Sequence, residues 1–299
     1  MTKAIWCVGI ATLDHIFGLD ALPSRAVKYR AQSFKAAGGG VAANSAVAVA
    51  RLGGRPSLLA RLGDDAIGAA IVAQLRACGV DCRHARHFAG CVSPVSAILV
   101  DAAGERIIVN YLDPALPDDT SWLPETIPDD VAVVLADTRW VAGSLAMLNR
   151  ARAQGRIALL DGDMPGCPPE LVAAATLVAF SAEGLRLVTG VSDLRDGLFR
   201  AARIGDGMMM VTDGANGAFW LESGILRHCP AFSVKVVDTL GAGDVFHGAL
   251  AVALAESASL SQAVRFASAA AAIKVTRFGG RDGAPLRAEV ETFLQQNKE

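Results

Sequence analysis

The chain has 299 residues, of which 52% are hydrophobic and 19% charged, so it can bury a sizeable core as one large α/β domain or two modest ones. Its net charge is −2 and it contains no long basic tract, which leaves nucleic-acid binding without electrostatic support. The apolar runs are too short for a signal peptide or a membrane span, and the six cysteines lack metal-ligand spacing. We therefore expect a cytoplasmic protein with reduced thiols and with neither a nucleic-acid nor a membrane partner.

Short apolar strands alternate with helical stretches through most of the chain, which predicts a parallel sheet with helices on both faces. Ligands in such folds gather at the carboxyl ends of the strands. The expected strands are residues 5–10, 57–61, 131–136, 157–160, 177–180 and 208–212, with helices such as 41–52, 66–77 and 144–153 between them.

Two segments break this alternation. Residues 12–35 contain Pro23 and alternate polar with apolar side chains, and residues 92–112 form two predicted strands around a turn at 101–104. We expect these two segments, 12–35 and 92–112, to pair as a discontinuous small β layer that covers the site. The α/β core would then consist of residues 1–11, 36–91 and 113–299.

The first candidate ligand-binding residues follow the first strand. Asp14 can accept two hydroxyl groups, which suits a sugar, although the residues alone favour a turn or cap role. Gly38, Gly39 and Gly40 form a glycine turn that opens a helix, and Asn44 lies one turn into that helix with a donor and an acceptor. Ordinary loop chemistry would also account for this second segment.

A second glycine turn follows the strand at 208–212. Thr212, Gly214 and Gly217 lie in this turn, and a plain β-turn is the preferred interpretation of the residues by themselves. Further along, residues 269–280 predict a helix that leads into a loop at Gly279 and Gly280.

A third glycine turn lies between an expected strand at 232–237 and a mostly apolar helix over 245–255. Gly241 and Gly243 can adopt backbone conformations closed to other residues, and the free N–H groups of a helix start favour negative charge. Asp244 could cap this helix. In a kinase it could also take the proton of a substrate hydroxyl, while the N–H groups stabilise the phosphoryl group in transfer.

The third turn closely resembles the C-terminal signature of the PfkB, or ribokinase-like, sugar kinases. The family pattern Asp-Thr-x-Gly-Ala-Gly-Asp is matched at each fixed position, by Asp238, Thr239, Gly241, Ala242, Gly243 and Asp244. The family's N-terminal Gly-Gly-x-x-x-Asn is matched by Gly39, Gly40 and Asn44, and its nucleotide loop Thr-x-Gly-x-x-Gly by Thr212, Gly214 and Gly217. The resemblance covers essentially the whole chain.

This resemblance implies a ribokinase-like three-layer α/β sandwich with a mostly parallel central sheet and a small β-sheet lid. It implies an ATP-dependent carbohydrate kinase that uses Mg²⁺, in which Asp244 is the base and the N–H groups of 240–244, including Gly241, Ala242 and Gly243, hold the phosphoryl group. Sugar binding falls on Asp14, Gly39, Gly40 and Asn44. Nucleotide binding falls on Thr212, Gly214, Gly217, Gly279 and Gly280. A homodimer through the lid is also expected.

The chain departs from the family at the residues that help to order the metal. Ser181 and Gly184 stand where the family has an asparagine and a glutamate, with Glu183 next to the second position. The identity of the metal ligands therefore stays open, although magnesium on the nucleotide phosphates remains the expected chemistry.

Within the family, segments 104–111, 135–140, 160–163 and 244–248 are similar to the kinases of 6-deoxy-6-sulfofructose. A sulfonate is a permanent anion that needs a cation and directed donors, and Lys28, Asn110 and Arg139 could supply them. This subgroup predicts phosphorylation of the C1 hydroxyl of 6-deoxy-6-sulfofructose. Fructose, 2-keto-3-deoxygluconate and a catalytically silent sugar- or nucleotide-binding protein are the alternatives.

Overall fold

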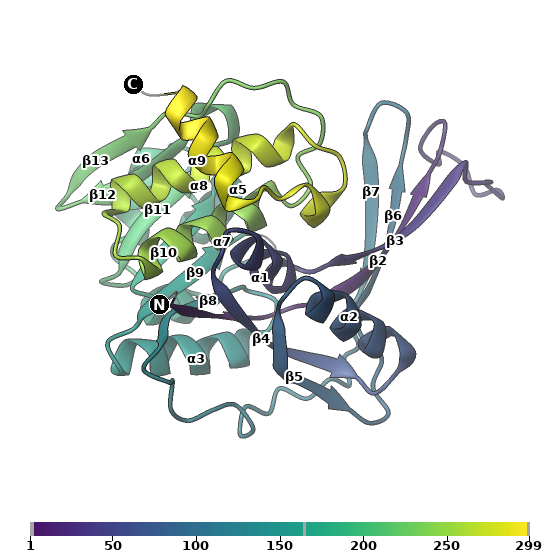
Figure 1. Cartoon of the computed structure of the whole chain (residues 1–299), viewed down its shortest axis with the longest axis horizontal. Coiled ribbons are helices and arrows are strands. Elements are labelled where there is room, and N and C mark those ends of the chain that lie inside the picture. The colour runs from purple at the N-terminus through teal and green to yellow at the C-terminus, as the bar shows by residue number, and fades with distance from the viewer. Residues whose placement is uncertain (1–2, 164–165, 298–299) are drawn as a thin grey trace.

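The computed structural model describes residues 3–163 and 166–297 and contains a nine-stranded sheet with the order β13-β12-β11-β10-β9-β8-β1-β4-β5 (Figure 1). Neighbouring strands run parallel from β11 to β5, whereas β12 and β13 pair antiparallel at one edge. The strands are β1 (Ala4–Val8), β4 (Arg55–Gly63), β5 (Asp81–Phe88), β8 (Val131–Ala136), β9 (Ile157–Gly162), β10 (Leu177–Ser181), β11 (Met208–Thr212), β12 (Ala218–Glu222) and β13 (Ile225–Cys229).

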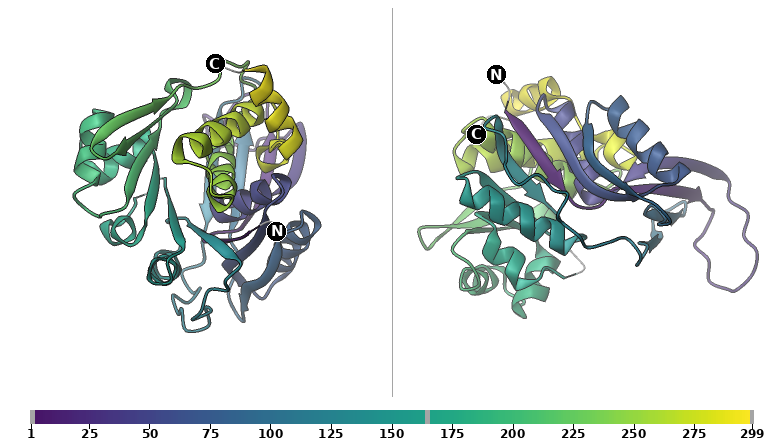
Figure 2. Two further views of the ribbon diagram at one scale, coloured as in Figure 1. Left: turned by 60° about the vertical axis from the view of Figure 1, so that its left-hand side comes forward. Right: turned by 90° about the horizontal axis from the view of Figure 1, so that it is seen from below.

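Helices cover both faces of this large sheet, because its strands send alternate apolar side chains to two separate cores. In β1, Ile5 and Cys7 enter one core, whereas Trp6 and Val8 enter the other. The first core includes α1 (Val41–Arg51), α2 (Ala66–Ala77), α7 (Ala242–Ala255), α8 (Leu260–Val275) and α9 (Arg287–Gln296). The second includes α3 (Val141–Ala153), α4 (Pro169–Ala174), α5 (Ala182–Thr189) and α6 (Leu194–Ala201), so the large sheet is the middle of three layers (Figure 2).

A separate four-stranded sheet, here called the small sheet, stands to one side of the three layers (Figure 1). Its order is β3-β2-β6-β7, with β2 and β6 parallel and the two outer pairs antiparallel. Its strands are β2 (Thr12–Gly18), β3 (Ser33–Gly39), β6 (Val95–Val100) and β7 (Arg106–Tyr111). The loop between β2 and β3 projects away from the body of the protein (Figure 2).

The expected mostly parallel sheet, the helices on both of its faces and the separate small β layer are confirmed. The small sheet extends through Gly39, beyond the expected boundary at residue 35. The division of the chain into a core and a lid domain stays a prediction.

The expected strand at 232–237 is wrong, because this segment has no strand partner. The N–H groups of Val237 and Asp238 donate instead to the carbonyl oxygen of Val275 at the end of α8, over 2.7 and 3.1 Å. Near its start, Phe232 packs edge-on against Phe293 of α9. The alternating side chains therefore cover helix ends, a contact that a local sequence pattern does not distinguish from a sheet edge.

The large sheet has a topological switch point at β1, which lies between β4 and β8: later strands are added on one side from β4 to β5 and on the other side from β8 to β13. A crevice forms at such a point, outside the carboxyl ends of the strands, and it is where open α/β sheets bind ligands. Here α7 contacts both β1 and β8. Among the helices that the structure describes, none is both long and apolar enough to cross a bilayer.

Candidate active site

The centre of the site is a contact between two helices. In the first turn of α7, Asp244 accepts a hydrogen bond through Oδ2 from Nδ2 of Asn44 on α1, over 2.7 Å. Ser45 donates to the backbone carbonyl of Asp244 over 3.1 Å. The helices approach this closely because Gly248 lies against the backbone of Ser45, where a Cβ would sit 2.7 Å from the carbonyl oxygen. The packing therefore brings together Asn44 and Asp244, two of the predicted site residues.

The backbone at the start of α7 presents free donors beside this carboxylate. Gly241 precedes the helix with φ 75°, a left-handed conformation that favours glycine. Within residues 3–163 and 166–297, no acceptor meets the N–H groups of Gly241, Gly243 and Asp244. Such donors and the helix dipole suit an anion.

Two of the five predicted N–H donors are not free. The N–H of Leu240 donates to Oδ1 of Asp238 over 2.8 Å, and that of Ala242 donates to the carbonyl oxygen of Thr239 over 3.1 Å. The expectation that every N–H from 240 to 244 faces the ligand is therefore corrected. The turn itself uses these two groups to fold back before the helix begins.

The Asp244 carboxyl is set to exchange a proton near neutral pH. Its removal from water and the negative charge of Asp161 raise the pKa of Asp244 to about 7, although the Asn44 amide and His247 act in the opposite direction. A general base works best when its pKa lies near the working pH. Asp244 is thus suited to accept a proton from a hydroxyl group.

Asp137, directly after β8, is a buried carboxylate that the sequence analysis did not assign. It accepts hydrogen bonds from the N–H groups of Ile10, Ala42 and Arg139, over 2.8, 3.1 and 2.8 Å. Burial raises the pKa of Asp137 to about 6, with the N–H groups of Ile10 and Arg139 acting in the opposite direction. Asp137 therefore ties the end of β1 and the start of α1 to β8, and so fixes the crevice in which Asn44 lies.

The small sheet contributes a polar row to the same region. Asp14, Ser96 and Asn110 lie directly opposite one another on β2, β6 and β7, so their side chains share one face. Asp14 accepts a hydrogen bond from Thr12 over 2.8 Å, and Asn110 donates to Ser96 over 3.2 Å.

A cavity of about 380 Å³ lies between this face of the small sheet and the loops of the large domain. Its walls include Asp14, Asn44, Arg106, Thr239, Gly279 and Arg281. Arg106 at the start of β7 crosses the cavity edge, donating to Thr239 over 3.0 Å and to Asp238 over 3.4 Å. The cavity therefore unites the N-terminal and C-terminal glycine turns, with Gly39 and Gly40 joining β3 to α1 beside it.

None of the three predicted anion-binding residues, Lys28, Asn110 and Arg139, is among the residues that line this cavity, although Asn110 lies on the same face of the small sheet as Asp14. Lys28 lies exposed in the projecting loop between β2 and β3. The Arg139 side chain donates to Thr138 over 3.2 Å and lies 3.9 Å from the Asp163 carboxylate, near the second core. The structure therefore does not bring Lys28, Asn110 and Arg139 together as one cluster.

The predicted nucleotide residues occupy two loops. Thr212 ends β11 and donates to the carbonyl oxygen of Phe180 over 3.4 Å, while Gly214 and Gly217 form the turn before β12. The N–H groups of Gly279 and Gly280 donate to Asp238 over 3.0 and 3.3 Å. The loop with Gly279 and Gly280 thus lies against the glycine turn at residues 238–244. The loop with Thr212, Gly214 and Gly217 lies at the carboxyl end of β11.

Asp238 is itself held by a buried cation. Lys274 of α8 has no exposed side-chain surface, and its ammonium donates to the backbone carbonyl of Asp238 over 2.8 Å and lies 3.3 Å from the carboxylate. Because the same carboxylate binds Leu240, Gly279 and Gly280, Lys274 fixes both loops at once. A lone lysine in the alanine-rich run 269–275 was the sequence signal that could have identified it.

The family's usual metal-ordering side chains do not fit here. Ser181 caps α5 by accepting a hydrogen bond from the N–H of Gly184 over 3.0 Å. A Cβ at Gly184 would lie 2.1 Å from the carbonyl oxygen of Gly162, so no glutamate can occupy that position, and Glu183 points to solvent. Within the described parts of the chain, no group of three or more histidine, cysteine or acidic residues is placed to hold a metal. The cysteines are free thiols.

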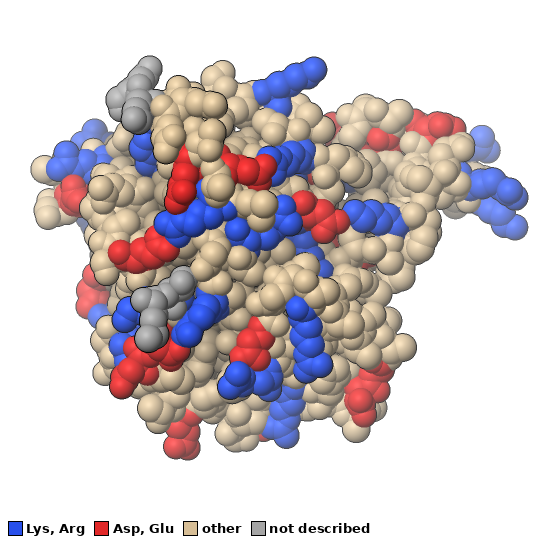
Figure 3. Space-filling model, viewed as in Figure 1, with Lys and Arg blue, Asp and Glu red and all other residues tan. Residues whose placement is uncertain are grey.

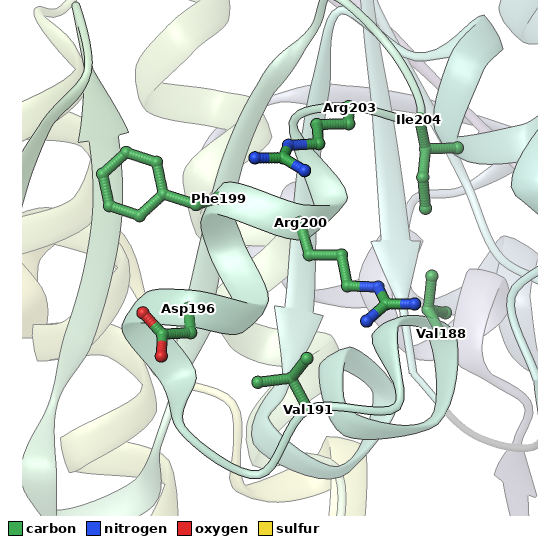
Figure 4. A pocket seen from close by; sticks show the side chains of 7 residues that line it. All are labelled: Val188, Val191, Asp196, Phe199, Arg200, Arg203 and Ile204. Atoms are coloured by element: carbon green, nitrogen blue, oxygen red, sulfur yellow. The ribbon is translucent and has the colours of Figure 1, made fainter.

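A larger groove of about 830 Å³ lies elsewhere, between α5 and α6 (Figure 4). Arg200 extends from α6 toward Val188 of α5. Asp196, Phe199 and Arg203 also line the groove. None of the predicted site residues lines it, so its volume does not make it the active site. The face of the molecule in Figure 3 mixes acidic with basic side chains, which leaves ligand charge to be met by local groups.

The mostly parallel large sheet and the separate small sheet define the class of the protein, a two-sheet α/β protein whose site places an acid beside N–H donors for an anionic group. The model of the pfkB family of carbohydrate kinases matches residues 2–287, and the chain belongs to that family. Ribokinase of Haemophilus influenzae is 26% identical over 99% of both chains, and fructokinase-1 of Oryza sativa is 28% identical over 89% of this chain and 90% of the relative. A crystal structure of a candidate ribokinase from Agrobacterium tumefaciens has a TM-score of 0.93 and 37% identity, covering 99% of this chain and 98% of that one. The ribokinase-like fold expected from the sequence is confirmed.

Proposed function

We propose that this protein transfers the γ-phosphoryl group of ATP to a sugar hydroxyl, with Asp244 as the base. The observation that carries the proposal is the position of its carboxylate, held by Asn44 at 2.7 Å beside the free N–H groups of α7. Asp244 would take the hydroxyl proton as the sugar oxygen attacks the phosphorus in line. The N–H groups of Gly241, Gly243 and Asp244 would stabilise the negative charge on the phosphoryl oxygens.

The sugar would lie in the cavity under the small sheet, which would act as a lid. Asp14 supplies two carboxylate oxygens and Asn110 an amide oxygen, since the Asn110 amide nitrogen already donates to Val95 and Ser96, and these acceptors suit hydroxyl groups. The buried Oδ1 of Asn44 has no hydrogen-bond partner among the described residues, and a sugar hydroxyl would satisfy it. Arg106 of the small sheet already donates a hydrogen bond to Thr239. Movement of the small sheet over the bound sugar would start from this contact and would exclude water from the site.

ATP would lie across the loops that contain Thr212, Gly214, Gly217, Gly279 and Gly280. Magnesium would arrive on the nucleotide phosphates rather than on a resident protein site, in keeping with the occupation of Ser181 and Gly184 by other contacts. No step of the proposed transfer depends on a metal ligand from the chain.

For the sugar we propose 6-deoxy-6-sulfofructose, phosphorylated at its C1 hydroxyl. The support is the likeness of segments 104–111, 135–140, 160–163 and 244–248 to kinases of that substrate. Arg106 at the cavity edge would meet an anionic group, with Asn110 on the same face of the small sheet, and Lys28 would join them only if the projecting loop folds inward. Arg139 would need to leave Thr138 and Asp163.

A substrate panel with ATP tests both levels of this proposal. We expect ADP formation with 6-deoxy-6-sulfofructose at a higher kcat/KM than with fructose, fructose 6-phosphate, 2-keto-3-deoxygluconate or ribose. Preference for fructose, 2-keto-3-deoxygluconate or ribose would overturn the sulfonate assignment while leaving the kinase intact. ADP formation with none of them would favour a silent binding protein, which calorimetry with the same sugars would then identify.

We also propose a homodimer formed through the outer face of the small sheet. Phe34, Phe17, Leu99 and Ile107 lie in one row across its four strands, and Val109 and Phe34 are 62% and 59% exposed. An apolar sheet face of this kind is unusual on a monomer surface, and a second copy presents the same face for an isologous contact.

A further inference from the structure

A buried ion pair lies directly beneath the proposed base. His247 is one turn after Gly243 on α7, and its Nδ1 lies 3.0 Å from Oδ2 of Asp161 at the end of β9. The two side chains are only 4% and 3% exposed. A buried charge in a protein interior is costly unless it is paired, so this pair needs an explanation.

The contacts of the His247 ring require a proton on both nitrogens. Nδ1 faces the carbonyl oxygen of Gly243 at 2.8 Å as well as the Asp161 carboxylate, and Nε2 faces the carbonyl oxygen of Ala179 at 3.1 Å. The two carbonyl oxygens can only accept hydrogen bonds, and each ring nitrogen faces one of them, so a neutral ring would leave one nitrogen against a carbonyl oxygen with no proton between them. Burial alone would lower the pKa of His247, but Asp161 and the two carbonyl groups outweigh it and raise the pKa.

The Gly243 carbonyl connects this cation to the anion-binding turn. The carbonyl of Gly243 and the N–H of Asp244 belong to one peptide group and point in opposite directions along α7. The imidazolium holds the carbonyl end of this peptide, and the other end is one of the free N–H donors. A cation at the carbonyl end also polarises the peptide and strengthens its N–H as a donor.

We propose that the His247–Asp161 pair positions the reaction centre, with the imidazolium anchoring the Gly243–Asp244 peptide from behind. His247 and Asp161 are positioning residues, since neither faces the cavity. This inference rests on the proposed function, because it assigns them a role in the same phosphoryl transfer.

The charges around Asp244 predict opposite effects for the two members of the pair. Asp161 and Asp163 from β9 and its following loop oppose ionisation of Asp244, whereas His247 on α7 favours it, and Lys274 on α8 also faces this group. Arg139 faces Asp161 from the end of β8. Loss of the imidazolium should therefore make Asp244 harder to ionise, and loss of the Asp161 charge should make it easier.

The test measures kcat against pH for His247→Gln, Asp161→Asn and the double variant, with ATP and the best sugar of the panel. In the plot of kcat against pH, we expect the midpoint of the acidic limb to lie about one pH unit higher in His247→Gln than in the wild type. In Asp161→Asn it should lie lower by a similar amount. The double variant should return toward the wild type. At pH 7.5 His247→Gln should lose roughly tenfold or more in kcat with little change in the KM for ATP, since the effect acts on the transferred group.

Matched controls and a direct measurement separate this role from a merely structural one. His84→Gln in β5 and Asp130→Asn in the exposed pair with Arg55 should leave the pH profile unchanged. Nitrogen NMR of the wild-type ring should show both His247 nitrogens protonated at pH 7.5. A singly protonated ring, or limbs that move in the same direction or not at all, would overturn the inference. An inactive wild type with a doubly protonated ring would instead count against the proposed function alone.

Discussion

Asn44 and Asp244, 200 positions apart in the chain, meet through a hydrogen bond of 2.7 Å between the amide of one and the carboxylate of the other. The contact fixes Oδ2 of the carboxylate, and the proposed function assigns the other oxygen to the substrate hydroxyl. It also places an amide that can contact a sugar at the same point as the proposed base.

Replacement of Asp244 by asparagine should abolish most of the activity. The amide cannot accept a hydroxyl proton, so we expect kcat to fall by about 10² to 10⁴-fold while the dissociation constant for ATP stays largely unchanged. Initial rates of ADP formation and calorimetry with ATP measure the two quantities. Turnover close to that of the wild type would remove Asp244 from the role of base.

The same replacement should stabilise the folded protein at alkaline pH. The pKa of Asp244 is raised from 3.8 to about 7 on folding, so its favourable contribution to stability is present below pH 3.8 and is lost as the pH rises through 7. Asp244→Asn has no charge to bury and should raise the free energy of unfolding at pH 8 by roughly 1–3 kcal/mol. Urea unfolding at pH 8 and at pH 4 measures this, and the gain should disappear at the lower pH. An equal increase in the free energy of unfolding at pH 8 and at pH 4 would contradict the proposed link between stability and the ionisation of Asp244.

Gly184 should not tolerate a side chain. A Cβ there would lie 2.1 Å from the carbonyl oxygen of Gly162, and we expect Gly184→Ala to lower the free energy of unfolding by about 1–3 kcal/mol. Glu183→Ala, at the neighbouring exposed position of α5, is the matched control and should change it by less than about 0.5 kcal/mol. It should also leave the magnesium dependence of turnover unchanged. A loss of magnesium response in Glu183→Ala would show that this carboxylate replaces the family's glutamate.

Lys274 should prove essential to the arrangement of the two loops near Asp244. Lys274→Met leaves the Asp238 carboxylate without its buried ammonium, so we expect a loss of about 3 kcal/mol in the free energy of unfolding and a reduced kcat. Lys235→Met removes an exposed charge from the preceding segment and serves as the control. Thermal unfolding and initial rates compare the two. Equal thermal stability and equal initial rates of Lys274→Met and Lys235→Met would contradict the role given to Lys274.

The proposed dimer should depend on the apolar outer face of the small sheet. Val109→Asp places a charge in the proposed interface, and sedimentation velocity should then show a monomer where the wild type is a dimer. Leu187→Asp, at an exposed position of α5 away from the small sheet, should leave the dimer intact. A wild-type protein that sediments as a monomer at micromolar concentration would refute the proposed dimer.

The sequence by itself determined what depends on neighbouring residues. Apolar runs of strand and helix length placed β8 and β11 at their observed bounds, and the pattern from Asp238 to Asp244 indicated an anion-binding turn followed by a helix with an acid in its first turn. These features are local, because strand periodicity, helix starts and glycine turns are set within a few residues.

Only the tertiary structure decided which distant groups share the site. His247 meets Asp161, and Lys274 meets Asp238, because helices α7 and α8 pack against each other on one face of the large sheet. Residues 232–237 bind the end of α8 instead of a sheet edge, and Lys28 in the loop between β2 and β3 lies apart from Arg139 after β8. Burial and charge pairing depend on the surroundings of a side chain in space, and no spacing along the chain specifies them.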